Sequence, residues 1–163
     1  MAIKDIASVV GQESVVQGWV NNKRSSGSIA FLELRDGTGF IQAVVAKDSV
    51  SADVWGAVEQ LTQESSVRVT GMVTKHPKLE QTYELQVSGL EIVSISEEYP
   101  IAKKEHGPEF LLENRHLWLR SKRQWAILRI RDTVETAIND YLHTQYFIRV
   151  DSPIFTPNAC EGT

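Results

Sequence analysis

The chain has 163 residues, of which 42% are hydrophobic and 23% charged, and this ordinary globular composition excludes disordered, collagen-like and disulfide-rich classes. A net charge of -4 argues against binding of nucleic acid by bulk charge attraction, and a single cysteine, Cys160, favours a reducing, cytoplasmic location. The first residues lack the features of a signal peptide, and no apolar run approaches the roughly 18 residues of a membrane span, so we expect no membrane association.

The first 95 residues are predicted to form five strands and one helix. The strand segments are short, rich in β-branched and aromatic residues and separated by turn residues; they comprise residues 14–22, 28–35, 39–46, 66–75 and 82–93. Between the third and fourth segments, residues 50–62 carry apolar side chains at helical spacing, with Ser51 as a suitable N-cap. This order predicts a mainly β protein with a five-stranded OB-fold barrel, which presents one face to oligonucleotides.

The alternation of side chains along a strand divides the second and third segments into two faces. One face is uniformly apolar and is predicted to line the core. It comprises Ala30, Leu32, Leu34, Ile41, Ala43 and Val45. Phe31 therefore lies on the outward face, where it shares the surface with Gln42. A two-residue turn at 36–37 would place Gln42 opposite Phe31, whereas a four-residue turn would place it opposite Glu33, one diagonal away.

The same alternation in the last strand directs Glu84 outward while Tyr83 and Leu85 face the core. An aromatic ring beside amide and carboxylate groups is a surface on which single-stranded bases stack and have their edges read. Arg24, predicted in the loop after the first strand, is placed to contact a phosphate. The alternative is that Phe31 is a single exposed aromatic residue, which is common on protein surfaces, or that the connector after the barrel covers it.

Residues 96–121 are predicted to form a hinge, because Pro100 and Pro108 interrupt regular structure, although 108–119 is compatible with a short helix. Residues 122–144 are the clearest helix of the chain, with one apolar stripe at the three- and four-residue spacing. The stripe consists of Ile127, Ile130, Val134, Ile138 and Tyr141. Residues 147–150 are then predicted as a strand that ends before Pro153, followed by a loop from 154 to 163.

Three strings in the sequence carry a specific resemblance. GWVNNKRSSGSIAFLELRDGTGFIQAVV resembles the N-terminal anticodon-binding OB domain of class IIb aminoacyl-tRNA synthetases, which charge the tRNAs for aspartate, asparagine and lysine. YPIAKKEHGPEFLLENRHLWLRSKRQWAILRIRD resembles the hinge and first catalytic-domain helix of bacterial asparaginyl-tRNA synthetases, and FIRVDSPIFTPNACEGT resembles the strand and loop that follow. The hinge string KEHG and the segment RHLWLR are of the asparagine type, whereas aspartate enzymes carry a segment nearer RYLDLR.

The resemblance implies a role for each outward residue of the barrel. Phe31 matches the aromatic residue that stacks on the middle anticodon base, a uridine, and Gln42 matches the amide that reads that uridine. Glu84 matches a residue that meets the third anticodon base, and Arg24 matches a basic position in the first inter-strand loop. The resemblance therefore implies that tRNA, through its asparagine anticodon loop, is the partner of this domain.

The resemblance also implies that 1–95 is the OB domain, 96–121 a hinge and 122–163 the start of a truncated class II catalytic domain. The long helix and the following strand match motif 1, which builds a homodimer interface, with Ile127, Ile130, Val134 and Pro153 as interface residues. The apolar stripe would then pack against its own catalytic sheet or against the other subunit. Glu161 matches the loop glutamate that holds the ammonium group of the substrate amino acid.

Motifs 2 and 3, whose arginines hold ATP in class II synthetases, do not occur in these 163 residues. The full-length relative is expected to use ATP and Mg²⁺, whereas this chain alone is expected to hold no cofactor, metal or catalytic residue and to be inactive in adenylate formation. Three alternatives stay open: a piece of an aspartate-type ligase, a stand-alone OB-fold binding module, and a regulatory paralogue that uses the OB face on a protein partner.

Overall fold

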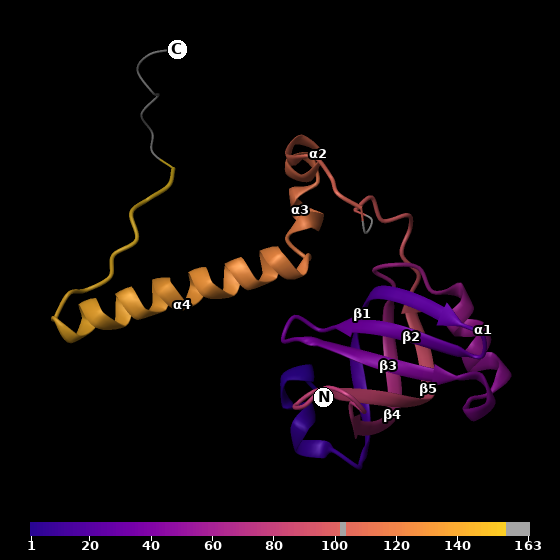
Figure 1. The fold of residues 1–163 in the computed structure, drawn as a ribbon. Helices are drawn as coiled ribbons and strands as arrows, with labels where there is room; N and C mark the ends of the chain where they lie inside the picture. The colour runs from indigo at the N-terminus through magenta and orange to yellow at the C-terminus, as the bar shows by residue number, and fades with distance from the viewer. Residues whose placement is uncertain (102–103, 156–163) are drawn as a thin grey trace. The chain divides into compact units, whose positions relative to one another are not determined.

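The structure is a computed structural model that describes residues 1–101 and 104–155, and it divides the chain into two compact units, Met1–Pro100 and Ile101–Thr163. The first unit is a closed barrel with the strand order β1-β2-β3-β5-β4 (Figure 1). The strands are β1 (Glu13–Ser26), β2 (Ile29–Arg35), β3 (Phe40–Ala46), β4 (Ser66–Lys75) and β5 (Tyr83–Ser94). The predicted mainly β fold with a five-stranded OB barrel is confirmed.

The barrel encloses one hydrophobic core, and the predicted division of β2 and β3 into two faces is confirmed. Their core residues are all buried: Ala30, Leu32, Leu34, Ile41, Ala43 and Val45. Val16 and Val20 of β1 are fully buried in the same cluster. Burial of apolar area at about 25 cal/mol per Å² is the main contribution to barrel stability.

Two glycines allow strands to approach each other at the places where the barrel closes. A Cβ atom on Gly18 of β1 would overlap the carbonyl oxygen of Arg35 in β2, and one on Gly71 of β4 would overlap that of Gln86 in β5. The β4–β5 register shifts between Thr70 and Gly71, which marks a bulge. Only glycine fits this close backbone approach.

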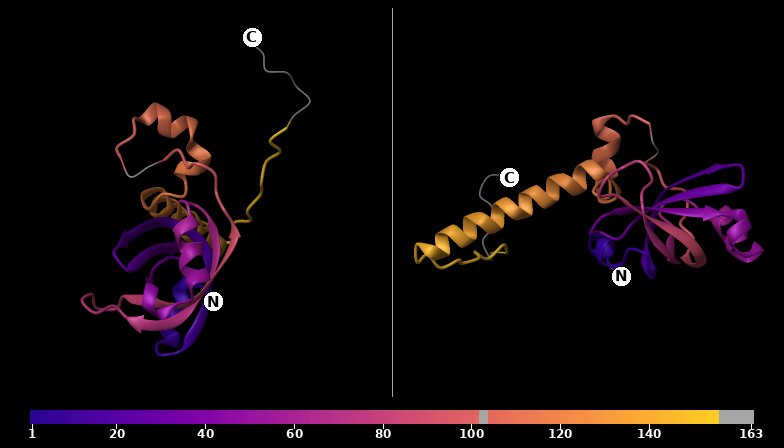
Figure 2. Two further views of the ribbon diagram at one scale, coloured as in Figure 1. Left: turned by 90° about the vertical axis from the view of Figure 1, so that its right-hand side faces the viewer. Right: turned by 60° about the horizontal axis from the view of Figure 1, so that its bottom comes forward.

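The helix α1 (Ala52–Gln60) connects β3 to β4 and packs against β5. The predicted cap is present, because the Ser51 hydroxyl accepts a hydrogen bond from the N–H of Val54 at 3.3 Å. Val58 and Leu61 contribute to the barrel core. Figure 2 shows α1 beside the barrel from two further sides.

Two short 3₁₀ helices, η1 (Ile3–Val9) and η2 (Lys47–Ser49), were not predicted from the sequence. In η1, Ile3 and Ile6 are buried in the barrel core. The N–H of Ile3 donates to the Asp36 carboxylate at 2.7 Å, so η1 is tied to the β2–β3 turn. Seven residues in a tight helix carry too short a periodic pattern to be recognised in a sequence.

The second unit contains α2 (Pro108–Glu113), α3 (Arg115–Trp118) and α4 (Lys122–Thr144). The predicted bounds of the long helix α4 are confirmed, and its N-cap is the hydroxyl of Ser121, which accepts from the N–H of Gln124 at 3.5 Å. The short helix predicted over 108–119 is present as two helices that meet at Asn114. None of the described residues of this unit is buried.

The strand predicted at 147–150 was wrong, because these residues have no regular secondary structure. A strand exists only when its backbone groups hydrogen-bond with a neighbouring strand, and the five strands of the described residues all belong to the barrel. Sequence alternation reports which side chains suit a strand but not whether a partner is available.

Candidate nucleic-acid interface

Four outward-facing residues of the barrel come together across neighbouring strands. Arg24 of β1 and Phe31 of β2 are direct cross-strand partners. Gln42 of β3 and Glu84 of β5 are partners in the parallel pairing of these strands. The β2–β3 turn has four residues, so Gln42 lies opposite Glu33 and one diagonal from Phe31, which is the second of the two registers considered.

A continuous series of contacts links these four side chains, which we call the platform: Arg24, Phe31, Gln42 and Glu84. The guanidinium carbon of Arg24 lies 4.6 Å from the centroid of the Phe31 ring, a cation–π contact. Arg24 Nη2 donates to Gln42 Oε1 at 3.0 Å, and Gln42 Nε2 donates to Glu84 Oε1 at 2.7 Å. The amide of Gln42 is thus held in one orientation, with its oxygen toward a cation and its NH₂ toward a carboxylate.

The predicted position of Arg24 in a loop was wrong, because β1 extends to Ser26. Gly27 has a φ of +60° and, with Ser28, forms a two-residue hairpin turn between Ser26 and Ile29. This short turn keeps Arg24 paired in the ladder, so its side chain lies over Phe31 instead of projecting from a loop.

The predicted outward direction of Glu84 does not make the residue exposed, because only 6% of its surface is accessible. Its carboxylate is covered by Gln42 from β3 and by His76, whose Nε2 lies 3.4 Å from Glu84 Oε1. A carboxylate is stable in such a position only when donors surround it. Sequence alternation gives the face of the sheet but not the side chains that cover that face.

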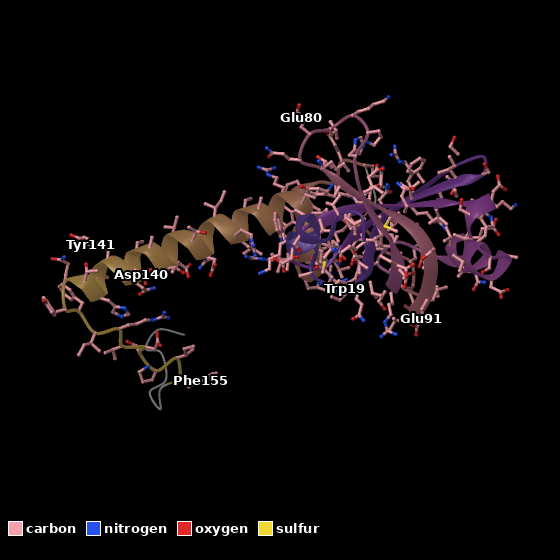
Figure 3. All side chains as sticks on the ribbon, turned by 90° about the horizontal axis from the view of Figure 1, so that it is seen from below. Trp19, Glu80, Glu91, Asp140, Tyr141 and Phe155 are labelled. Carbon is pink, nitrogen blue, oxygen red and sulfur yellow. The ribbon has the colours of Figure 1, made fainter. Side chains whose placement is uncertain are left out.

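His76 belongs to this group of residues and was missed in the sequence. It begins the loop that joins β4 to β5, and its Nδ1 accepts hydrogen bonds from the N–H groups of Lys78 and Leu79, both at 3.1 Å. This loop lines a hollow of about 600 Å³ and carries Glu80 (Figure 3). A histidine followed by proline in a polar loop was the only signal available in the sequence.

A second amide–carboxylate pair lies beside the platform. Asn21 Nδ2 donates to Glu33 Oε2 at 2.5 Å, and Asn21 occupies the position where the β1–β2 register shifts. Glu33 is the cross-strand partner of Gln42. The face therefore presents two carboxylates and two amides around one ring, which is a set of hydrogen-bonding groups suited to base edges.

Lys23, the neighbour of Arg24, faces α1 instead of the platform. Its Nζ donates to the carbonyl oxygens of Val58 and Glu59 at 3.1 and 2.9 Å. Burial lowers the pKa of the Lys23 ammonium, although the nearby Glu59 carboxylate opposes this shift. Lys23 thereby fixes α1 to the strand that carries Arg24.

Asp36 organises the turn between the two strands that carry Phe31 and Gln42. Burial disfavours its charged form, but hydrogen bonds from the Thr38 side chain and from the N–H groups of Ile3, Thr38 and Gly39 outweigh this effect. The pKa of the Asp36 carboxyl is therefore lowered from its ordinary value. This four-residue turn sets the β2–β3 register, which places Gln42 opposite Glu33 and one diagonal from Phe31.

The interface residues expected in the second unit are exposed side chains in the structure. Ile127, Ile130 and Val134 of α4 are 45%, 66% and 52% exposed, and Pro153 is exposed too. The stripe continues to Tyr141, which Figure 3 labels. Glu161, the expected contact to the amino-acid substrate, lies outside the described residues, as does Cys160.

The arrangement on the barrel is suited to binding. Across 1–101 and 104–155 there is no group of three His, Cys, Asp or Glu side chains that could hold a metal ion. None of the helices in these ranges is both long and apolar enough to cross a membrane. The ring can stack on a base, and the two amides and two carboxylates can form hydrogen bonds with its edge.

Two family models match the chain, one for each unit. The model described as "OB-fold nucleic acid binding domain" matches residues 15–93. The model described as "tRNA synthetases class II (D, K and N)" matches residues 107–163. The matched ranges coincide with the barrel and with the helical unit.

Curated relatives are similar to the chain over its whole length. The chain is 51% identical over 164 residues to an asparagine–tRNA ligase of Sorangium cellulosum, covering 100% of this chain and 37% of that protein. It is 50% identical over 163 residues to one of Lactobacillus johnsonii, covering 100% of this chain and 38% of that protein. The chain thus spans little more than a third of the length of these relatives.

Solved structures have the same fold. An asparaginyl-tRNA synthetase from Pyrococcus horikoshii in complex with asparaginyl-adenylate matches with a TM-score of 0.85 and 32% identity, covering 99% of this chain and 38% of that one. An aspartyl-tRNA synthetase from Entamoeba histolytica has a TM-score of 0.77 at 23% identity, covering 94% of this chain and 39% of that one. The second likeness shows the fold alone.

Proposed function

The chain belongs to the asparaginyl-tRNA synthetases, and from this membership we propose that its barrel binds the anticodon loop of the asparagine tRNA. The observation that carries the proposal is the platform. Four residues from four different strands are joined by contacts of 4.6, 3.0 and 2.7 Å on one face of an OB fold. An unrelated surface would have no need of an aromatic ring, an oriented amide and a carboxylate in register.

Each platform residue has a role in this proposal. Phe31 stacks on the middle anticodon base, and Gln42, already oriented by Arg24 and Glu84, reads the edge of that base. Glu84 meets the third anticodon base as a hydrogen-bond acceptor. Arg24 is partnered by Phe31 and Gln42 in the free protein, so binding of RNA exchanges part of these contacts for a phosphate.

We further propose that the chain acts within a ligase that activates asparagine with ATP and Mg²⁺ in the cytoplasm and transfers it to tRNA. The support is the 51% identity to an asparagine–tRNA ligase, while the chain covers 37% of that protein. Glu161 is the one residue of the chain proposed to touch the substrate, through its ammonium group.

The α4 stripe is proposed to be a homodimer interface that includes Ile127, Ile130, Val134 and Pro153. Its support is the exposure of large apolar side chains at helical spacing. Sedimentation equilibrium would test this directly. A dimer that dissociates when Ile130 is replaced by Asp supports the interface, and a wild-type chain that is monomeric at all concentrations contradicts it.

The anticodon proposal is tested by titrating the chain with two RNA stem-loops. One carries the asparagine anticodon and the other has its middle uridine replaced by cytidine. Because uracil and cytosine present different donors and acceptors to one fixed amide, we expect the second to bind more weakly by about 1–3 kcal/mol, the usual value of one bidentate base contact. Equal affinity for both stem-loops would contradict reading by Gln42.

The stand-alone binding module remains a second candidate, because the barrel is a closed unit whose site lies within Met1–Pro100. The two candidates differ in whether the second unit contributes to function, for example by forming a dimer through α4. A chain of 1–100 that binds the stem-loop as tightly as 1–163 does, together with a chain of 1–163 that stays monomeric at all concentrations, favours a separate module, because the second unit then has no measurable role.

A further inference from the structure

His76 connects the β4–β5 loop to Glu84 and has no role in the function proposed so far. Its backbone N–H donates to the carbonyl of Thr82 at 2.8 Å, which closes the loop. Its side chain is 20% exposed and lies between this loop and the Glu84 carboxylate, which is 8% exposed. A half-buried imidazole between a loop and a buried carboxylate makes contacts on both of its nitrogens.

The contacts of His76 fix which ring nitrogen carries the proton. Nδ1 accepts from the N–H groups of Lys78 and Leu79, both at 3.1 Å, and a nitrogen that accepts cannot carry a proton. The neutral imidazole therefore has its proton on Nε2. That nitrogen lies 3.4 Å from Glu84 Oε1, so its N–H faces the carboxylate at a distance that a small shift closes.

Both protein donors approach the same oxygen of Glu84. Gln42 Nε2 donates to Oε1 at 2.7 Å, and His76 Nε2 faces Oε1 as well. Within the described part of the chain, the side-chain hydrogen bond and the ion pair of Glu84 both involve Oε1. Gln42 is hydrogen-bonded to Oε1 and His76 faces the same oxygen, which leaves Oε2 as the acceptor available to a ligand.

We propose that His76 is a positioning residue of the anticodon site, and this rests on the proposed function. Its Nε2–H holds Glu84 so that Oε2 faces the bound base, and its Nδ1 holds the β4–β5 loop beside it. The chemical group recognised at this point is an N–H donor on the edge of a base, because an ionised carboxylate can only accept a hydrogen bond. A base without such a donor loses this contact.

Two substitutions test the contacts of Nδ1 and Nε2 of His76 separately. His76→Asn keeps an acceptor near the position of Nδ1, so the backbone turn over Lys78 and Leu79 is retained, but it cannot reach Glu84. His76→Gln has a longer side chain whose NH₂ reaches toward Glu84, while its fit to the turn is lost. Each variant is titrated with the asparagine stem-loop and with the same stem-loop made abasic at the third anticodon position.

The ratio of the two affinities reports the contact to the third base. In His76→Asn we expect this ratio to fall by about 3- to 10-fold, the value of one hydrogen bond, with an unchanged unfolding midpoint. In His76→Gln we expect the ratio to stay within about 2-fold of the wild type while amide exchange in the loop accelerates. A wild-type ratio in His76→Asn, or an equal loss in both variants, would overturn the proposal.

A spectroscopic measurement on the wild-type chain tests the same assignment without RNA. Long-range ¹H–¹⁵N correlation of the imidazole at neutral pH is expected to show the Nε2–H tautomer of His76, and an Nδ1–H tautomer would overturn the proposal. Failure of the anticodon function is recognised separately, because equal binding of the uridine and cytidine stem-loops by the wild type would leave the tautomer result unaffected.

Discussion

The barrel and the helical unit place their apolar residues in opposite ways. In the barrel, the apolar faces of five strands close on each other, and Leu32 and Leu34 are fully buried. In the second unit, no described residue is buried, and Ile130 on the stripe of α4 is 66% exposed. The barrel buries its apolar residues without help from the second unit and holds all four platform residues. The apolar stripe of α4, in contrast, stays exposed in the described residues.

The platform illustrates what a complete unit allows. Backbone pairing fixes the strands that carry it, and Arg24 and Glu84 orient the amide of Gln42 before any ligand arrives. Such preorganisation lowers the cost of ordering side chains on binding. The α4 stripe depends instead on a covering surface, which is why its role is tested by association and not by ligand binding.

The largest expected effect follows from burial. Replacing Leu32 with Ala leaves a cavity in the barrel and should lower the free energy of unfolding by about 2–5 kcal/mol. The matched change Leu112→Ala on α2 removes a side chain that is 58% exposed and should change the free energy of unfolding by less than about 0.5 kcal/mol. Urea unfolding followed by circular dichroism measures both. Similar losses in the two variants would contradict the contrast between the units.

The next effect tests the close approach of strands in the barrel. A methyl group at Gly71 would overlap the Gln86 carbonyl, so Gly71→Ala should cost about 1–3 kcal/mol of stability through overpacking. Gly56 lies inside α1 with no heavy atom within 4 Å of an added Cβ. The control Gly56→Ala should therefore stabilise the chain by about 0.5–1 kcal/mol. Destabilisation by both changes would contradict the predicted difference.

A smaller effect concerns pH. The folded-state pKa of Asp36 is lowered, so its ionised form contributes stability above the unfolded pKa, and this contribution is lost as pH falls through the folded pKa. We expect the wild-type unfolding free energy to decrease below about pH 4, near the ordinary carboxyl pKa. The Asp36→Asn variant should show a flatter acid limb. An identical pH dependence in both proteins would exclude this turn as a contributor.

Two of the four platform residues were placed correctly from the sequence, because alternation along a strand is a local property. Phe31 and Gln42 were placed on the outward face by residues within their own strands, and the structure agrees. Glu84 was expected to face outward and is nevertheless buried, because Gln42 and His76 reach it through a parallel strand pairing and a loop that no local pattern encodes. The strand expected at 147–150 failed for a related reason, since pairing requires a distant partner.

The smallest effect concerns salt. The first unit carries 8 Lys and Arg against 13 Asp and Glu, so base stacking and not bulk charge is expected to hold the RNA. With two or three phosphate contacts and about -0.7 per contact on a single strand, the slope of log K against log salt should be near -2. Titrations of the stem-loop at several salt concentrations measure it, and a slope near -7 would indicate about ten contacts.

The most direct test of the central claim is the affinity of the Phe31→Ala variant for the asparagine stem-loop. Loss of one base–aromatic stack should weaken binding by about 1–3 kcal/mol. The control Tyr146→Ala removes a ring that is 96% exposed in the other unit and should bind as the wild type does. Unchanged affinity in Phe31→Ala, with the protein folded, would contradict the assignment of this face of the barrel to the anticodon.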